Sequence, residues 1–198
     1  MDLSQAANYF IDTLCDAWTL TDGWLLGRVY GKLSPATALQ SFGAPARWRN
    51  LLVTSPLSYP VIRVGGSSGP VYVVGQATQD IDISPYGYTH PAYLADSLVE
   101  IYQVSTQPPS VGLAALADKA TRTPVGGSRG FPCGIDRAGT SQAFDAVMSD
   151  MVIVMPNSVA LTAQHELDDA DYTYQVKEAY KANGLQVVRA TRKKKVTS

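Results

Sequence analysis

The sequence predicts a mainly β protein of the α+β class, built on a small antiparallel β-barrel or sandwich with an N-terminal amphipathic helix and long loops or arms. Short β-prone runs separated by turn residues support this prediction, as do the 16 glycines, 12 prolines and 11 tyrosines among 198 residues. Apolar residues make up 45% of the chain, which is enough for a core, and a net charge of −1 is not typical of a disordered protein or of a globally basic nucleic-acid binder.

The N-terminal part, residues 1–58, is predicted to contain one helix followed by an irregular segment. Apolar side chains in residues 3–18 recur at steps of three and four, which is the period of an amphipathic helix. They are Leu3, Ala6, Ala7, Phe10, Leu14 and Trp18. Prolines and a glycine interrupt residues 24–55, where the pattern is ambiguous and residues 36–42 are compatible with a short helix.

A β-rich core is expected from residues 59–106 and 140–191. In its first half, the β-prone residues 59–64 and 71–77 flank a stretch rich in glycine and serine, which predicts a hairpin. Residues 98–104 predict a further strand.

Two segments are predicted as loops and one as a tail. Two prolines and a glycine break the pattern over residues 84–91. Residues 107–139 hold four prolines and six glycines, which predicts a long excursion with at most one short helix near residues 111–119. The basic and polar residues 192–198 are expected to form a mobile tail unless a partner orders them.

The C-terminal third gives the clearest pattern. Strands are expected over residues 151–155 and 159–167. Tyr172, Tyr174, Val176 and Tyr180 share one parity, which predicts that they face the same side of a strand. Asn183-Gly184 then supplies the residues that a type I′ turn requires, so a hairpin returns over residues 185–190.

Charges of one sign gather in blocks along the chain. Residues 1–27 carry four acids and no base, residues 28–79 carry five bases and no acid, and residues 179–198 carry six bases and no acid. Such blocks need no functional explanation if folding brings the acidic and basic segments together so that their charges alternate on one surface. A functional explanation is that opposite ends of the protein present opposite potentials to neighbouring subunits, because complementary patches steer and align partners.

Patterns that would hold phosphate or metal are incomplete in this sequence. Residues 27–32 fall one residue short of a phosphate-binding loop, and Leu33 stands where a hydroxyl is needed. His165 opens a sequence similar to a zincin helix but lacks its second histidine, and only His90 remains elsewhere. The acids at 168, 169 and 171 lack the glycine and the glutamate of a calcium loop, which favours a solvated turn. We therefore expect no metal and no cofactor.

One pattern is compatible with an enzyme. Residues 126–130 match Gly-x-Ser-x-Gly, with Ser128 in the place of a nucleophile, and Asp150 and His165 follow in the order of α/β-hydrolases. Prolines on both sides do not fit the strand and helix that a nucleophile elbow needs. A flexible glycine–serine loop is the simpler interpretation.

The sequence contains no apolar stretch of about 20 residues and no basic N-terminal signal region, which predicts a cytosolic protein without a membrane span. Cys15 and Cys133, far apart in the sequence, are expected to be reduced, partly buried thiols.

Residues 150–192 resemble the C-terminal part of small head–tail joining proteins of tailed bacteriophages, the head-closure (stopper) and adaptor proteins of the virion neck. The match consists of a strand, a polar strand, a turn and a hairpin, and it is carried by Pro156-Asn157, Asp168–Asp171, Tyr172-Thr173-Tyr174-Gln175-Val176 and Asn183-Gly184-Leu185. In that family such hairpins close a small β-barrel. The role within the neck stays open among stopper, adaptor and tail terminator.

The resemblance implies a non-enzymatic structural subunit that joins the portal side of a capsid to the tail. It implies a homo-oligomeric ring of six or twelve subunits, contacts with other neck, portal and tail proteins, and a place in the virion after assembly in the host cytoplasm. Contact with packaged DNA is left open. The interface residues expected from the charge blocks are Asp12, Asp16, Arg189, Arg192, Lys193, Lys194 and Lys195. The alternatives are a small serine hydrolase using Ser128 and a nucleic-acid-binding accessory protein using the basic tail.

Overall fold

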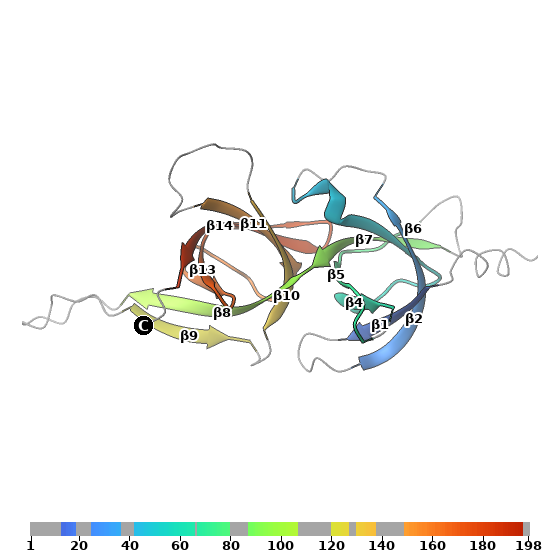
Figure 1. Ribbon diagram of the computed structural model, residues 1–198, viewed down its shortest axis with the longest axis horizontal. Helices are drawn as coiled ribbons and strands as arrows, with labels where there is room; N and C mark the ends of the chain where they lie inside the picture. Colours follow the sequence, from blue (N-terminus) through green and yellow to red (C-terminus); the bar gives the residue numbers. More distant parts are fainter. Residues whose placement is uncertain are drawn as a thin grey trace, which may run out of the picture.

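The computed structural model describes residues 13–18, 25–36, 42–65, 67–79, 87–106, 120–126, 130–137 and 149–195. These residues form two closed antiparallel β-barrels that lie side by side (Figure 1). The prediction of a mainly β protein with a small antiparallel barrel is therefore confirmed. No helix among the described residues is long and apolar enough to cross a membrane.

The first barrel is made of residues 13–95, with the strand order β3-β2-β1-β4-β5-β7-β6. It closes because β3 pairs with one side of β7, while β5 and the short β6 pair with successive parts of its other side. A 3₁₀ turn, Pro45–Arg47, leads into β3. The strands are β1 (Thr13–Trp18), β2 (Leu25–Pro35), β3 (Trp48–Val53), β4 (Val61–Val64), β5 (Val71–Val74), β6 (Thr78–Gln79) and β7 (Tyr88–Ala95).

The second barrel follows after a single residue, Asp96, so β7 and β8 run almost continuously from one barrel into the other (Figure 1). Its strand order is β10-β11-β14-β13-β12-β8-β9, and pairing of β8 with β10 closes it. The strands are β8 (Ser97–Thr106), β9 (Ala120–Val125), β10 (Phe131–Arg137), β11 (Ser149–Pro156), β12 (His165–Asp168), β13 (Tyr172–Ala182) and β14 (Leu185–Lys194). The β-rich core expected from residues 59–106 and 140–191 is thus divided between two barrels.

Each barrel has its own apolar interior, filled by alternate residues of its strands. Cys15, Leu51 and Ile62 belong to the first interior. Cys133 and Ile153 belong to the second. Both cysteines are free and buried, as the sequence predicts. Burial raises the pKa of the Cys15 thiol to about 11 and that of Cys133 further still, so both thiols are protonated at neutral pH.

A third apolar cluster joins the outer faces of the two barrels, and we call it the seam. The first barrel contributes buried Trp48 and Tyr93, whose rings meet edge to face with centroids 4.7 Å apart. The second barrel contributes Val154, Leu185 and Val187, which are fully buried in the same cluster. Two barrels that share a buried cluster of this kind are held as one unit.

A β-bulge between Val176 and Glu178 changes which side chains of β13 face the seam. Tyr174 and Val176 face the interior of the second barrel, as their shared parity predicts. The extra residue in the bulge moves the later part of the strand by one position, so Tyr180 packs against the seam instead of the interior. The prediction that Tyr180 shares a face with Tyr174 is therefore wrong.

The predicted N-terminal helix is wrong where the structure describes it. Residues 13–18 form β1, which pairs with β2 on one side and β4 on the other. A step of four residues between apolar side chains, as from Leu14 to Trp18, also returns to the same face of a strand, so this spacing does not separate the two structures. The rest of the predicted helix, and residues 37–41 of the short helix, lie outside the described residues.

Two loop predictions that were based on prolines are wrong where the structure has strands. The predicted loop at residues 84–91 overlaps β7, where Pro91 lies opposite the break between β5 and β6 and accepts a hydrogen bond from the Gly75 amide (2.8 Å). A proline is tolerated there because the ladder is already interrupted. The predicted excursion at residues 107–139 contains β9 and β10; Pro124 lies in the edge strand β9, and Pro132 lies in β10 opposite Leu98 of β8. The irregular segment predicted before residue 58 contains β2 and β3.

The hairpin predictions hold in both barrels. β4 pairs with β5, and β13 pairs with β14. Asn183 and Gly184 both have positive φ angles, 52° and 77°, as a type I′ turn requires. The strand expected over residues 159–167 is shorter than predicted, because only residues 165–168 form β12.

The Asn183-Gly184 turn packs against the first barrel, and this contact gives a testable consequence. The Gln76 amide donates a hydrogen bond to the Asn183 carbonyl (2.8 Å), and a Cβ on Gly184 would lie 2.4 Å from the Gln76 nitrogen. We expect Gly184→Ala to lower the free energy of unfolding by about 2 kcal/mol or more, through both backbone strain and this clash. Gly65→Ala is the matched control, because Gly65 also has a positive φ of 84° but open space around it. Equal losses in urea unfolding would contradict the docking of the turn.

His90 links three segments of the first barrel from a buried position on β7. The Leu57 amide donates to Nε2 (3.0 Å), so Nδ1 carries the hydrogen and donates it to the Gly75 carbonyl (2.8 Å). This arrangement requires the neutral ring, and burial lowers the pKa of His90 below its ordinary value of 6.5.

The lowered pKa of His90 predicts that the protein loses stability in mild acid. The unfolded chain takes up a proton below about pH 6.5, whereas the folded chain resists it, so the free energy of unfolding falls as the pH drops below that value. Urea unfolding at pH 7.5 and pH 5 measures the loss. His90→Gln is expected to be less stable at pH 7.5 but to show a smaller difference between the two pH values. The same difference in both proteins would show that other groups cause it.

Candidate functional site

The basic residues predicted as an interface do not form a free tail. Arg189 and Arg192 lie within β14, and the strand continues to Lys194. The Arg192 guanidinium stacks over the Tyr172 ring, 4.4 Å from its centroid. The Lys195 ammonium lies 3.2 Å from a carboxylate oxygen of Asp168. The prediction of a mobile tail is wrong up to Lys195, because cross-strand pairing and these contacts hold the chain, and residues 196–198 lie outside the described part.

The five basic residues of this predicted interface have different neighbours and different exposure. Arg189 forms a long contact with Glu178 (3.8 Å), and both side chains are mostly exposed. Lys193 is exposed and lies 3.4 Å from the Gln175 side-chain oxygen, while Lys194 is exposed at the end of the strand. An exposed ion pair is worth only about 0–1 kcal/mol, so Arg189 remains accessible to a partner.

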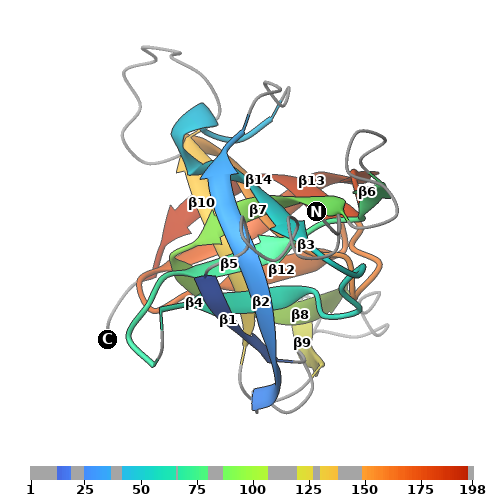
Figure 2. The ribbon, with the colours of Figure 1, turned by 90° about the vertical axis from the view of Figure 1, so that its right-hand side faces the viewer.

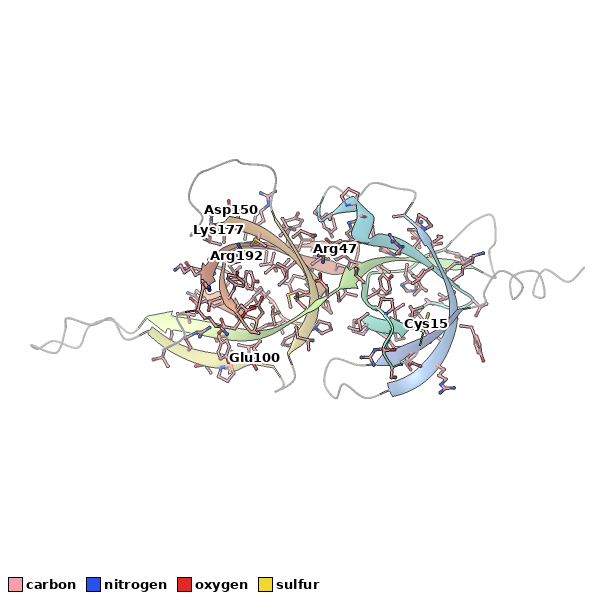
Figure 3. The ribbon with its side chains drawn as sticks, in the orientation of Figure 1. Cys15, Arg47, Glu100, Asp150, Lys177 and Arg192 are labelled. Carbon is pink, nitrogen blue, oxygen red and sulfur yellow. The ribbon has the colours of Figure 1, made fainter. Side chains whose placement is uncertain are left out.

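The two predicted acids lie apart from these bases. Asp12 lies outside the described residues. Asp16 is on β1 of the first barrel, in register with Arg28 on one neighbouring strand and Arg63 on the other. Figure 3 shows Cys15, next to Asp16 in the chain, in the first barrel and Arg192 in the second. The structure therefore does not bring Asp16 together with the predicted basic groups within one chain.

The second barrel carries an arm made of β8 and β9. β9 pairs only with β8, through residues 101–106 and 120–125, and no described strand covers its other edge. Figure 1 shows this pair reaching past β13 and β14 at the left end of the molecule. An open edge is a template for pairing with another chain.

Arg122 fixes the arm to the barrel. Its guanidinium lies 3.0 Å from a Glu166 oxygen and 2.8 Å from an Asp168 oxygen, and it stacks over the Tyr102 ring at 4.3 Å from the centroid. Burial alone would raise the pKa of Asp168, but hydrogen bonds from Arg122, Thr173 and Lys195 lower it below its ordinary value. Asp168 is thus a charged anchor shared by the arm and the end of β14.

A groove of about 700 Å³ runs between the barrels, and the sequence did not predict it. Its lining comes from the segment before β3 and from β10, β11, β13 and β14: Phe42, Gly43, Ala44, Pro45, Asp136, Asp150, Met151, Val152, Lys177, Glu178, Tyr180, Arg189 and Ala190. The β13 bulge leaves Lys177 and Glu178 both exposed beside the groove. Lys177 reaches across β14 to Asp150, with its ammonium 2.7 Å from the carboxylate. The groove therefore has an apolar floor and a rim of both charges.

One wall of the groove is a polar lock between the barrels. Asp136 on β10 accepts hydrogen bonds from the Ala44 amide (3.0 Å) and the Tyr93 hydroxyl. Arg47 lies 3.1 Å from the other oxygen of Asp136 and 2.7 Å from Asp96. The hydrogen bond to Asp96 is the main cause that raises the pKa of Arg47. A Cβ on Gly134 would lie 2.4 Å from the Tyr93 ring, so β10 approaches β7 closely beside the lock.

The residues that the structure describes give no support to the alternative chemistries. Ser128 lies outside them. Asp150 is exposed and paired with Lys177, while His165 is buried and its Nδ1 accepts a hydrogen bond from the Thr162 amide (3.1 Å), so neither contacts the other. Residues 27–32 lie within β2 rather than in a loop. No group of three metal-ligating side chains gathers within the described ranges.

The Asp169 carboxylate stabilises the turn in which it lies. One carboxylate oxygen accepts hydrogen bonds from the Asp171 and Tyr172 amides (2.8 and 2.7 Å), and the other accepts one from the Tyr174 hydroxyl (2.5 Å). Burial and this hydrogen bond raise the pKa of Tyr174. The turn at residues 168–171 therefore has a structural explanation.

Comparison of the chain with protein-family models, with curated proteins and with solved structures finds no match.

The lock gives a prediction with an internal control. Asp136→Asn leaves one acceptor oxygen for three donors and removes the charge that Arg47 faces, so we expect a loss of about 1–3 kcal/mol in the free energy of unfolding. Asp150→Asn makes the same change at the exposed pair with Lys177 and is expected to cost less than about 1 kcal/mol. Chemical unfolding of both variants measures the difference. Equal effects would mean that the lock contributes no more than a surface ion pair.

Proposed function

We propose that this protein is a structural subunit of a tailed-phage virion that assembles into a homo-oligomeric ring at the head–tail junction. The observation that carries the proposal is the β8–β9 arm, which extends an open strand edge from a body of two joined barrels. An edge on one subunit that pairs with a different surface on the next makes a heterologous contact, and such contacts close into rings when the rotation allows. The ring would stand between the portal side of the capsid and the tail.

The resemblance of residues 150–192 to neck proteins supports the same proposal. These residues form β11 to β14, and the hairpin that turns at Asn183 lies within the second barrel. The groove between the barrels, with charges of both signs at its rim, offers a second contact surface for a neighbouring neck or tail protein. Contacts of this kind repeat in every subunit, so small terms accumulate around a ring.

Native mass spectrometry and negative-stain electron microscopy of the purified full chain test the proposal. We expect rings of one defined subunit number, six or twelve. Lysines at the edge strand should prevent pairing, because charged side chains on an edge disfavour its extension by another strand. Thr121→Lys combined with Thr123→Lys, both at exposed positions of β9, is therefore expected to give monomers.

The matched control is Gln175→Lys, which adds a lysine at an exposed position of β13, a strand that is paired on both sides. Rings that persist in this variant and disappear in the β9 variant would support the arm as the contact. A monomeric wild-type protein at all concentrations and salt conditions would contradict the proposal.

A further inference from the structure

The outward face of β2 carries an alternation of basic and aromatic side chains that the proposed ring contact does not use. Val29 and Leu33 pack against the interior of the first barrel, so Arg28, Tyr30 and Lys32 face outward. Tyr30 is 66% exposed, which is unusual for a large aromatic side chain. Figure 2 shows β2 crossing the face of the first barrel that is turned toward the viewer, with β1 and β4 beside it.

The first barrel is basic where the structure describes it. Its described strands and connections contain five bases, and Asp16 is their one acid. Asp16 is in register with Arg28 on β2 and with Arg63 on β4. These three residues form a row across the sheet with two positive charges and one negative charge. Arg63 extends the basic face from β2 to β4, where it also donates a hydrogen bond to the Ser67 carbonyl (2.8 Å).

We propose that this face, formed by Arg28, Tyr30 and Lys32 with Arg63 beside them, binds single-stranded nucleic acid. Arg28 and Lys32 stand about 13 Å apart along the strand, which lets them contact different phosphates of one strand. Tyr30 lies between these two basic residues, and its ring is exposed. Unpaired nucleobases stack on exposed aromatic rings of this kind while neighbouring basic side chains contact the phosphates. A duplex offers phosphates but no free base for Tyr30.

Charge argues against a second copy of this chain as the occupant. The described part of the second barrel holds nine bases and eight acids, so its overall charge does not attract the basic face of another copy. The basic residues of β14 are also less suited to the role than β2, because the aromatic ring beside them, Tyr172, is stacked under Arg192, whereas Tyr30 is 66% exposed. The nucleic-acid contact considered for the C-terminal bases is thus better placed on β2.

The test is fluorescence anisotropy with a labelled oligothymidine of about 20 nucleotides, titrated with the full-length protein at several salt concentrations. Single-strand binding loses about 0.7 in the logarithm of affinity per tenfold rise in salt for each phosphate contacted. Replacing Arg28 and Lys32 together by alanine should therefore reduce this slope by about 1.4. Tyr30→Ala should weaken binding by about five- to a hundredfold at every salt concentration without changing the slope, and Tyr30→Phe should bind like the wild type.

Lys193→Ala combined with Lys194→Ala is the control, since it removes two exposed bases from β14 and should leave binding unchanged. Thermal unfolding confirms that each variant is folded. No binding at about 50 mM salt, or binding that depends on Lys193 and Lys194 but not on β2, would overturn the proposal. The proposal would also be overturned if the protein bound a duplex as tightly as oligothymidine and Tyr30→Ala had no effect. It would be overturned as well if polyglutamate displaced the labelled oligothymidine as effectively as unlabelled oligothymidine does. Each of these outcomes is independent of whether the protein forms rings.

Discussion

The apolar seam between the two barrels is the contact on which the rest of the structure depends. Fully burying a leucine or valine contributes about 1.5–3 kcal/mol, and a buried tryptophan contributes more. Leu185 and Val187 of one barrel meet Trp48 and Tyr93 of the other within this cluster. The surface ion pairs near the groove are each worth about 0–1 kcal/mol, so burial and not charge decides how the barrels sit. The seam fixes the walls of the groove, aligns Arg47 with Asp136, and directs the arm and the β2 face away from each other.

Much of the fold follows from local patterns in the sequence. The Asn183-Gly184 turn was predictable because only a few residue types adopt two successive positive φ angles. β1 was not predictable from spacing, since a step of four residues fits a helix and a strand alike. Pro91 suggested a loop because the sequence does not show that the neighbouring strand is interrupted at that point. The bulge after Val176 was equally invisible, yet it decides that Tyr180 belongs to the seam.

The candidate surfaces were harder to predict than the fold. The charge blocks suggested opposed ends, but folding pairs many of the charges locally, as Lys195 and Arg122 pair with Asp168. The groove combines residues from five distant segments, and no sequence pattern predicts such a meeting. The alternation of Arg28, Tyr30 and Lys32 was visible in the sequence, but Pro35, Gly43 and Pro45 left the segment ambiguous, and the structure places β2 between β1 and β3. Each surface is defined by tertiary packing.

Because of the seam, the two barrels behave as one body, and their surfaces are held in fixed positions. Differential scanning calorimetry of the full chain in its monomeric state tests it most directly, because coupling through the seam makes the barrels unfold together. We expect a single transition in which the calorimetric and van't Hoff enthalpies agree, and a loss of this agreement when Leu185 in the seam is replaced by aspartate. Two separate transitions in the wild-type protein would contradict it.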